Sequence, residues 1–226
     1  MKLIVKYGSL LSLILAVCVE SQGGEGMAMR GRFTSDGYRN LRRQPDAVTV
    51  ITETGTVDLV GDATGAWTGA GIRVTTVAKA DGLHVSLAAP GAAVKKLRLH
   101  WRGAPEMGWK YLGDAWERGY GDLEWRMLDG KRPMPWYVLA SDGRRTHAYG
   151  VMTQPAALCC WKLDERGLTL LADVRCGGAG VRLSTRTLEV CTTGFLPPIV
   201  SESAFAPATG VWLQQLVLRL RQLKRR

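Results

Sequence analysis

The residues best suited to chemistry in this sequence lie in one short stretch, GDAWERGYGDLEW, which runs from Gly113 to Trp125. The stretch contains two tryptophans, a tyrosine, an arginine, three glycines and four carboxylates. A glycosidase needs two carboxyl groups about 5 Å apart, or about 6.5 to 9.5 Å apart, beside the scissile bond. Aromatic faces flanked by carboxylates also suit carbohydrate, because a sugar ring offers an apolar face and a rim of hydroxyls.

Three interpretations of this stretch follow from its composition. Carboxylates so close in sequence rarely face one sugar ring from opposite sides, which disfavours a catalytic pair. The two tryptophans could instead belong to the core, with the neighbouring polar side chains bonded to turn backbone. In the third interpretation the stretch contacts carbohydrate or another domain through six residues: Asp114, Trp116, Glu117, Arg118, Tyr120 and Trp125.

Other catalytic signatures are absent from the sequence. His84, His100 and His147 are scattered over strand-like segments without an HExxH motif, so structural histidines are expected. Gly119 and Gly121 lack the third glycine and the following helix of a phosphate-binding turn. We therefore predict no catalytic residue, no bound metal and no cofactor.

The hydrophobic pattern that must position these residues has a period of two from Val48 onward, as in β-strands. Turn residues fall about every ten positions, and no helical pattern of ten or more residues separates the strand-like segments. This spacing predicts an all-β fold over residues 47–195, an antiparallel β-sandwich of supersandwich-like type. Strands are expected at 48–54, 56–62, 72–80, 83–89, 94–101, 135–143, 147–154, 157–167, 168–178 and 181–190.

Both ends of the chain depart from the strand pattern. Residues 1–21 contain two lysines, an apolar run and small residues before a possible cleavage site, which predicts a signal peptide. Residues 22–46 are expected to form a flexible lead-in. The Pro-Pro pair after Leu196 should stop the β pattern, and residues 196–226 should form a linker and a short, basic, amphipathic helix.

The leader sequence predicts an exported protein in the periplasm, outside the cell or on its surface. Two alternatives stay open. A lipoprotein could be attached through Cys18, although the valine before it is a poor match to the small residue expected there. Translation could also begin at Met27 or Met29, which would leave the protein in the cytoplasm.

The positive charge of the chain is concentrated at its end. The formal net charge is +10, and half of it comes from the five cations among the last eight residues. The strand-rich part therefore carries too small an excess of cations to predict nucleic-acid binding. Membrane contact is expected only through the signal segment or the tail.

Four cysteines follow the predicted signal peptide: Cys159, Cys160, Cys176 and Cys191. Three pairings into disulfides are open to them in an exported protein, and buried free thiols are the alternative. Cys159 and Cys160 point to opposite faces if they lie on a strand, so a zinc site is not expected.

Three blocks of the sequence resemble the N-terminal β-sandwich portion of secreted bacterial α-galactosidases of the melibiase type. The blocks are YLGDAWERGYGDLEW, MPWYVLASDGRRTHAYGV and ALCCWKLDERGLTLLADVRCGGAGVRL, and the resemblance covers about Val48 to Val190. In that family the sandwich precedes a (β/α)₈ barrel, in which two aspartates hydrolyse α-galactosides with retention. The sandwich lies against the barrel and can lend residues to the rim of the sugar pocket.

The resemblance implies a role without catalysis. SESAFA, residues 201–206, looks like the family's linker, whereas the ending LVLRLRQLKRR does not, and no barrel pattern follows. We therefore expect a truncated, non-catalytic β-sandwich that packs on a catalytic barrel and borders its sugar pocket. The alternative is a free-standing carbohydrate-binding or cell-surface module. A sandwich without its barrel should expose a large apolar patch, whereas a module should be polar apart from an aromatic platform.

Overall fold

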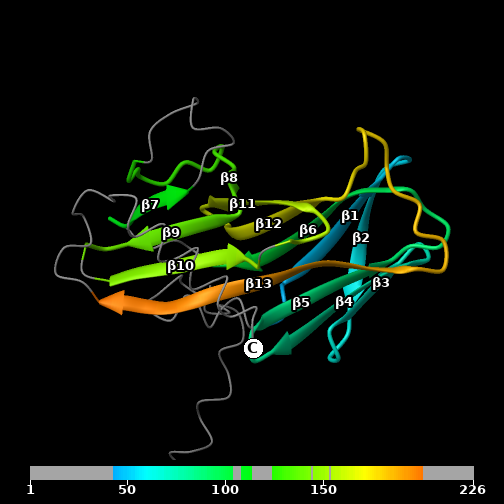
Figure 1. Ribbon diagram of the computed structural model, residues 1–226, viewed down its shortest axis with the longest axis horizontal. Coiled ribbons are helices and arrows are strands. Elements are labelled where there is room, and N and C mark those ends of the chain that lie inside the picture. The colour runs from blue at the N-terminus through cyan, green and yellow to red at the C-terminus, as the bar shows by residue number, and fades with distance from the viewer. Residues whose placement is uncertain (1–42, 104–107, 114–123, 144, 153, 201–226) are drawn as a thin grey trace, which may run out of the picture. The chain divides into compact units, whose positions relative to one another are not determined.

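The computed structural model describes residues 43–103, 108–113, 124–143, 145–152 and 154–200. All regular secondary structure in these residues is β-strand, and every strand pairing is antiparallel (Figure 1). The strands are β1 (Ala47–Thr52), β2 (Thr56–Gly61), β3 (Ala66–Gly69), β4 (Ile72–Lys79), β5 (Gly82–Ala88), β6 (Val94–Arg102), β7 (Lys110–Gly113), β8 (Met134–Pro135), β9 (Tyr137–Ser141), β10 (Arg145–Val151), β11 (Leu158–Asp164), β12 (Gly167–Asp173) and β13 (Thr187–Val200).

The strands form one sheet in the order β7-β9-β10-β13-β5-β4-β3-β2-β1-β6-β12-β11-β8. The two ends of this sheet approach each other, because β8 and β11 at one end contact β9 at the other. The sheet is therefore nearly closed, in a barrel-like manner. The predicted all-β, antiparallel fold class is confirmed.

One hydrophobic core is shared by both halves of the sheet. On β6, Leu97, Leu99 and Trp101 alternate with polar residues and are fully buried, as the period-two pattern predicts. Trp161 of β11 lies beside Trp101, with ring centroids 6.4 Å apart. Core residues such as Val85 of β5 come from the other half of the sheet, so closing the sheet is what buries them.

The hairpin between β11 and β12 requires a glycine. Gly167 has a φ of +145°, and a Cβ atom added there would lie 2.0 Å from the carbonyl oxygen of Trp101. Only a glycine combines this backbone conformation with so close an approach to β6. In the register of β12 against β6, Gly167 pairs with Arg102.

The last strand differs from the expectation that the Pro-Pro pair would stop the β pattern. β13 continues to Val200 and pairs with β10 as far as Arg145 (Figure 1). The register shifts between Thr146 and Ala148, opposite the two prolines. β5 pairs only with Thr187–Thr193, so the prolines lie where β13 has one neighbouring strand, a position that tolerates a missing N–H.

Four further differences concern three short strands and the start of the last strand. The sequence pattern missed β3, β7 and β8, which have four, four and two residues. The strand expected at 181–190 begins only at Thr187, and Val181 forms an isolated bridge with Val94. Strands this short offer too few alternating positions to be recognised by period.

The end of the predicted lead-in is bound to the sheet. The indole N–H of Trp101 donates to the carbonyl oxygen of Arg43 at 3.1 Å, and Asp46 accepts the backbone N–H of Arg102 at 2.6 Å. The signal segment, most of the lead-in and the predicted C-terminal helix lie outside the described residues. In the part of the chain that the structure describes, no helix is long and apolar enough to cross a membrane.

Candidate functional site

Most of the predicted contact segment cannot be placed. Trp125 is described and is partly buried. It packs against a small cluster formed by Leu112, Tyr137 and Ala148, apart from the main core. The other five predicted contact residues lie outside the described residues: Asp114, Trp116, Glu117, Arg118 and Tyr120.

Both flanks of this segment meet at β7. The backbone N–H of Tyr111 donates to the carbonyl oxygen of Arg126 at 2.7 Å, and the N–H of Arg126 donates back at 2.9 Å. Arg132 donates through Nη2 to the carbonyl oxygen of Gly113 at 3.3 Å. The chain therefore leaves β7 after Gly113 and returns to the same strand after Trp125, so both ends of the predicted contact segment are held at one place.

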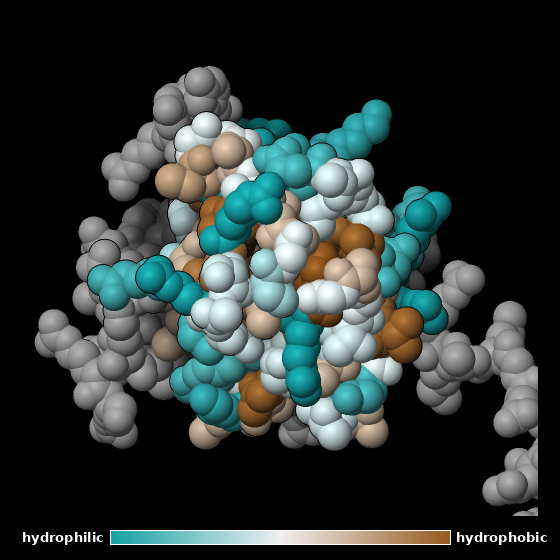
Figure 2. All heavy atoms as spheres, turned by 90° about the vertical axis from the view of Figure 1, so that its right-hand side faces the viewer, coloured by the Kyte–Doolittle hydropathy of each residue, from teal (hydrophilic) through white to brown (hydrophobic). Residues whose placement is uncertain are grey.

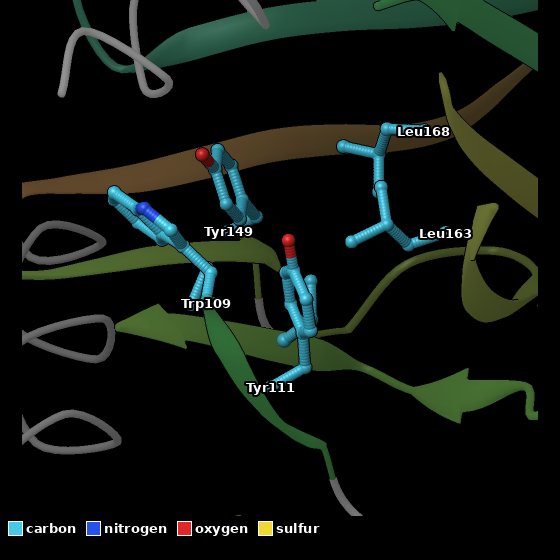
Figure 3. A pocket seen from close by; sticks show the side chains of 7 residues that line it. Trp109, Tyr111, Tyr149, Leu163 and Leu168 are labelled. Carbon is cyan, nitrogen blue, oxygen red and sulfur yellow. The ribbon is translucent and has the colours of Figure 1, made fainter. Parts of the chain in front are cut away.

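Aromatic side chains gather on the inner side of β7. Trp109, Tyr111 and Tyr149 line a hollow, and Leu163 and Leu168 line it from the other side (Figure 3). Its free volume is about 10 Å³, which is about the space of one water molecule. The hollow is too small for a sugar ring, so these aromatic residues act as the interior of this end of the sheet.

Trp136 is an exposed aromatic residue in the described part of this region. It lies between β8 and β9, and 38% of its surface is accessible, whereas its neighbour Tyr137 is buried. Its φ is +64°, in the left-handed region that costs a non-glycine residue of the order of 1–2 kcal/mol. Such a conformation persists only where surrounding contacts enforce it, and it is common at functional sites.

The backbone of Trp136 joins the two ends of the sheet. Its N–H donates to the carbonyl oxygen of Cys159 on β11, and its carbonyl oxygen accepts the N–H of Val151 on β10, both at 3.0 Å. The same carbonyl oxygen accepts the indole N–H of Trp161 at 3.1 Å. These three hydrogen bonds hold the backbone of Trp136 in the left-handed conformation, and its side chain is exposed at the surface.

The carboxyl groups of the described residues are arranged for structure. The Arg175 side chain donates to Asp173 and lowers the pKa of that carboxyl. At Asp46 burial raises the pKa, but hydrogen bonds from the Arg43 side chain and the Arg102 backbone outweigh it. A glycosidase acid needs a raised pKa. Every resolved carboxyl shift in the described part is a lowering: Asp46, Glu53, Asp62, Asp81 and Asp173.

The histidines also have local partners. Nδ1 of His100 lies 2.9 Å from Oγ1 of Thr169, and burial lowers the pKa of His100. Nε2 of His84 lies 2.9 Å from a carboxylate oxygen of Asp81. The side chain of His147 is outside the described part. Within the described ranges, no group of three or more His, Cys, Asp or Glu side chains could hold a metal ion.

The comparisons with known proteins give no relative. No protein-family model, no curated protein and no solved structure matches this chain. The resemblance to melibiase-type α-galactosidases therefore stays a prediction that rests on the three sequence blocks.

The sequence interpretation did not single out Trp136 or the aromatic residues of the hollow. Trp109 and Tyr111 are two positions apart and so share a face of an extended chain, which could have identified the hollow. Trp136 directly precedes Tyr137, so one of the two rings had to point outward on a strand. The left-handed backbone that holds it there has no signal in the sequence.

Proposed function

We propose that this chain is the non-catalytic N-terminal β-sandwich of an α-galactosidase-like glycoside hydrolase. In this proposal the two halves of the nearly closed sheet correspond to the layers of the family's sandwich. In this proposal the exposed Trp136 and the contact residues predicted from the sequence pack on a catalytic barrel and border its sugar pocket: Asp114, Trp116, Glu117, Arg118, Tyr120 and Trp125. Galactose-containing carbohydrate and the barrel are the partners, and no cofactor takes part.

The observation that carries the proposal is the exposed indole of Trp136 on a rigid backbone. An exposed indole can cover the apolar face of a sugar or a partner surface, and the fixed backbone of Trp136 limits the ordering that this contact requires. The hollow lined by Trp109, Tyr111 and Tyr149 has space for about one water molecule and cannot take a sugar. A second surface is therefore needed to complete a sugar pocket, as expected for a domain that borders a pocket formed elsewhere.

The proposal includes export. The leader at residues 1–21 would direct the chain to the periplasm, the outside of the cell or its surface. Expression in a bacterium with the native N-terminus should then give a mature protein that starts near Gln22. Intact mass with an uncut Met1 in a soluble cytoplasmic fraction would contradict export.

The first experiment tests the non-catalytic assignment. Residues 22–226 should release no product from an aryl α-galactoside, because a retaining glycosidase needs a pair of carboxyl groups in one pocket and the sequence offers no such pair. Turnover above a heat-inactivated control, abolished by Asp114→Asn or Glu117→Gln, would overturn the assignment.

The second experiment tests the contact surface. Wild type and Trp136→Ala are titrated calorimetrically with a separately produced barrel domain of a melibiase-type α-galactosidase. Loss of an exposed aromatic contact at an interface costs about 2 kcal/mol or more, so Trp136→Ala should weaken binding about thirtyfold. Val60→Ala is the matched control, because Val60 is also an exposed hydrophobic residue but lies on β2, far along the sheet order from β9. Equal affinity of wild type and Trp136→Ala, or no binding by wild type, would contradict the proposal.

The exposed hydrophobic residues favour a second candidate, a free-standing carbohydrate-binding or cell-surface module. On the face shown in Figure 2, hydrophobic residues form separate small groups with hydrophilic side chains between them. Large hydrophobic residues that are exposed in the described part are Val60, Val77, Met127 and Trp136. A module of this kind would bind galactose-containing oligosaccharides directly, without a barrel, and Trp136→Ala would abolish that binding.

A further inference from the structure

A carboxylate, an imidazole and a hydroxyl group lie in series on the outer face of β5 and β13. Nε2 of His84 lies 2.9 Å from Oδ1 of Asp81, and Nδ1 of the same ring lies 3.3 Å from Oγ1 of Thr192. The side chains of His84 and Asp81 are 25% and 45% accessible, and Thr192 is partly buried, so solvent reaches the series. An acid, a base and a hydroxyl in this order are the groups that activate a nucleophile for acyl transfer.

The two contacts determine which ring nitrogen of His84 carries the proton. The hydrogen bond with His84 lowers the pKa of Asp81 below its ordinary value of 3.8, so the carboxylate is ionised at neutral pH and can only accept. Nε2 of the neutral ring is therefore the donor to Asp81, and Nδ1 keeps a lone pair that accepts the hydroxyl proton of Thr192. Hydrogen bonds of this kind are often long in free enzymes and shorten when a substrate is bound.

Neighbouring strands place these groups in one row of the sheet (Figure 1). His84 of β5 pairs with Thr192 of β13 on one side and with Val77 of β4 on the other. Asp81 belongs to the short turn between β4 and β5. Val77 is 43% accessible, so an exposed apolar side chain lies beside the base. A carboxylic ester with an apolar part fits this row, because that part can cover Val77 while the carbonyl carbon meets Thr192.

Close packing of β5 against β13 fixes the site. A Cβ atom added to Gly82, at the start of β5, would lie 1.9 Å from the carbonyl oxygen of Thr193. Only a residue without a side chain permits this approach, which brings the turn that carries Asp81 onto β13 next to Thr192. Groups held on packed strands keep their geometry better than groups on long loops.

We propose that Thr192, His84 and Asp81 form an acyl-transfer site that hydrolyses small carboxylic esters. Oγ1 of Thr192 forms a bond to the carbonyl carbon of the ester, and its proton passes to Nδ1 of His84. The bond from the carbonyl carbon to the alcohol oxygen breaks, and the alcohol leaves with the proton from Nδ1. Water then attacks the acyl-threonine with the same proton transfers, which releases the carboxylic acid and restores the hydroxyl of Thr192. Asp81 is a positioning residue, because it holds the ring in the required tautomer.

This site does not depend on the proposed function, which concerns glycosides and a barrel domain. Turnover of an ester and turnover of an α-galactoside are separate measurements, so either proposal can fail alone. His84 and Thr192 are 108 residues apart in the chain, which is why the sequence predicted only a structural histidine.

The test uses the purified full chain and para-nitrophenyl butyrate. Wild type should release para-nitrophenol faster than a heat-inactivated control, and peptide mapping after an acid quench should find the butyryl group on Thr192. His84→Asn should slow the acylation of Thr192 about a hundredfold, because general-base catalysis contributes about 10²–10⁴ in rate. Thr192→Val, which lacks the hydroxyl, should lose the fast release of product.

The positioning role of Asp81 is tested by a pair of variants. Asp81→Asn can donate its amide N–H to Nε2, which moves the ring proton to Nδ1 and should slow acylation at least about tenfold. Asp81→Glu keeps a carboxylate and should recover most of the rate. If Asp81 only stabilised the turn, the acylation rates of the two variants would follow their melting temperatures instead.

Another histidine–threonine pair of the described residues is the matched control. Nδ1 of His100 lies 2.9 Å from Oγ1 of Thr169, but no carboxylate of the described residues is hydrogen-bonded to this ring. His100→Asn and Thr169→Val should therefore keep the rate of wild type.

Circular dichroism checks the folding of every variant, and if His84→Asn does not fold, the peptide map of wild type decides. A wild-type map without a butyryl group on Thr192, or equal acylation of Thr192 in wild type and folded His84→Asn, would overturn the proposal.

Discussion

The tryptophans of the core and the tryptophan at the end of the sheet have opposite environments. Trp101 and Trp161 are fully buried and lie on regular strands, with their ring centroids 6.4 Å apart. Trp136 is exposed and has a left-handed backbone. The buried rings stand where the period-two pattern holds, and the exposed ring stands where that pattern is interrupted. Tryptophan at a regular strand position therefore stabilises the fold, whereas tryptophan at the crossover between β8 and β9 is available for contact.

The largest expected loss of stability follows from replacing a tryptophan of the buried pair, Trp101 and Trp161. Trp161→Ala removes a fully buried ring and the hydrogen bond from its indole to Trp136, so it should lower the free energy of unfolding by about 3–5 kcal/mol. Chemical denaturation followed by circular dichroism measures this change. A loss below about 1 kcal/mol would show that Trp161 is not a core residue. The comparison of buried tryptophans with the exposed Trp136 would then fail.

The second largest loss of stability is expected at Gly167, in the hairpin between β11 and β12. Gly167→Ala should cost about 1–3 kcal/mol, because its Cβ would collide with the carbonyl oxygen of Trp101 and its φ is unfavourable for alanine. Gly71→Ala is the matched control, since Gly71 also has a positive φ but has nothing within 4 Å of an added Cβ. Equal losses in denaturation midpoints for both variants would show that β12 does not approach β6 as described.

A smaller difference in stability is expected between two variants that test the left-handed backbone of Trp136. Trp136→Gly and Trp136→Ala both remove the ring, but only glycine adopts a φ of +64° without strain. Trp136→Gly should therefore be more stable than Trp136→Ala by about 1 kcal/mol, measured by thermal unfolding. If the alanine variant is the more stable one, the left-handed conformation is not present in solution.

The smallest effect concerns the ion pair on the outer side of β12. The pKa of Asp173 is lowered below 3.8 by the hydrogen bond from Arg175, so its contribution is present above about pH 3.8 and is lost as the pH falls through the lowered value. Asp173→Asn should cost at most about 1 kcal/mol at pH 7, and this cost should shrink as the pH falls below about 3.8. A difference in melting temperature that stays constant over this pH range would contradict the linkage.

The regular part of the fold could be predicted from the sequence because its strands are long and alternate. β1, β4, β5, β6, β11 and β12 lie within two residues of the expected segments or inside them. β8 has two residues and carries no periodic signal. β13 passes through two prolines because its neighbour shifts register there, which is a property of the pair of strands and not of either sequence alone.

The candidate site was less predictable for a physical reason. The composition of Gly113 to Trp125 identified an aromatic, acidic segment, but a sequence does not show which rings become buried. Trp136 was inside a block of the family resemblance and was overlooked, because its exposure depends on hydrogen bonds to Cys159 and Val151, which are distant in sequence. Closure of the sheet creates this exposed position.

The most direct test of the contact role of Trp136 is hydroxyl-radical footprinting of individual tryptophans by mass spectrometry. In the free protein Trp136 should be oxidised at least several times faster than Trp101 or Trp161. Saturation with a melibiase-type barrel domain, or with a galactose-containing oligosaccharide for the module candidate, should protect Trp136 and leave the two buried residues unchanged. Oxidation of Trp136 at an unchanged rate under saturation with either partner would contradict the proposed contact surface.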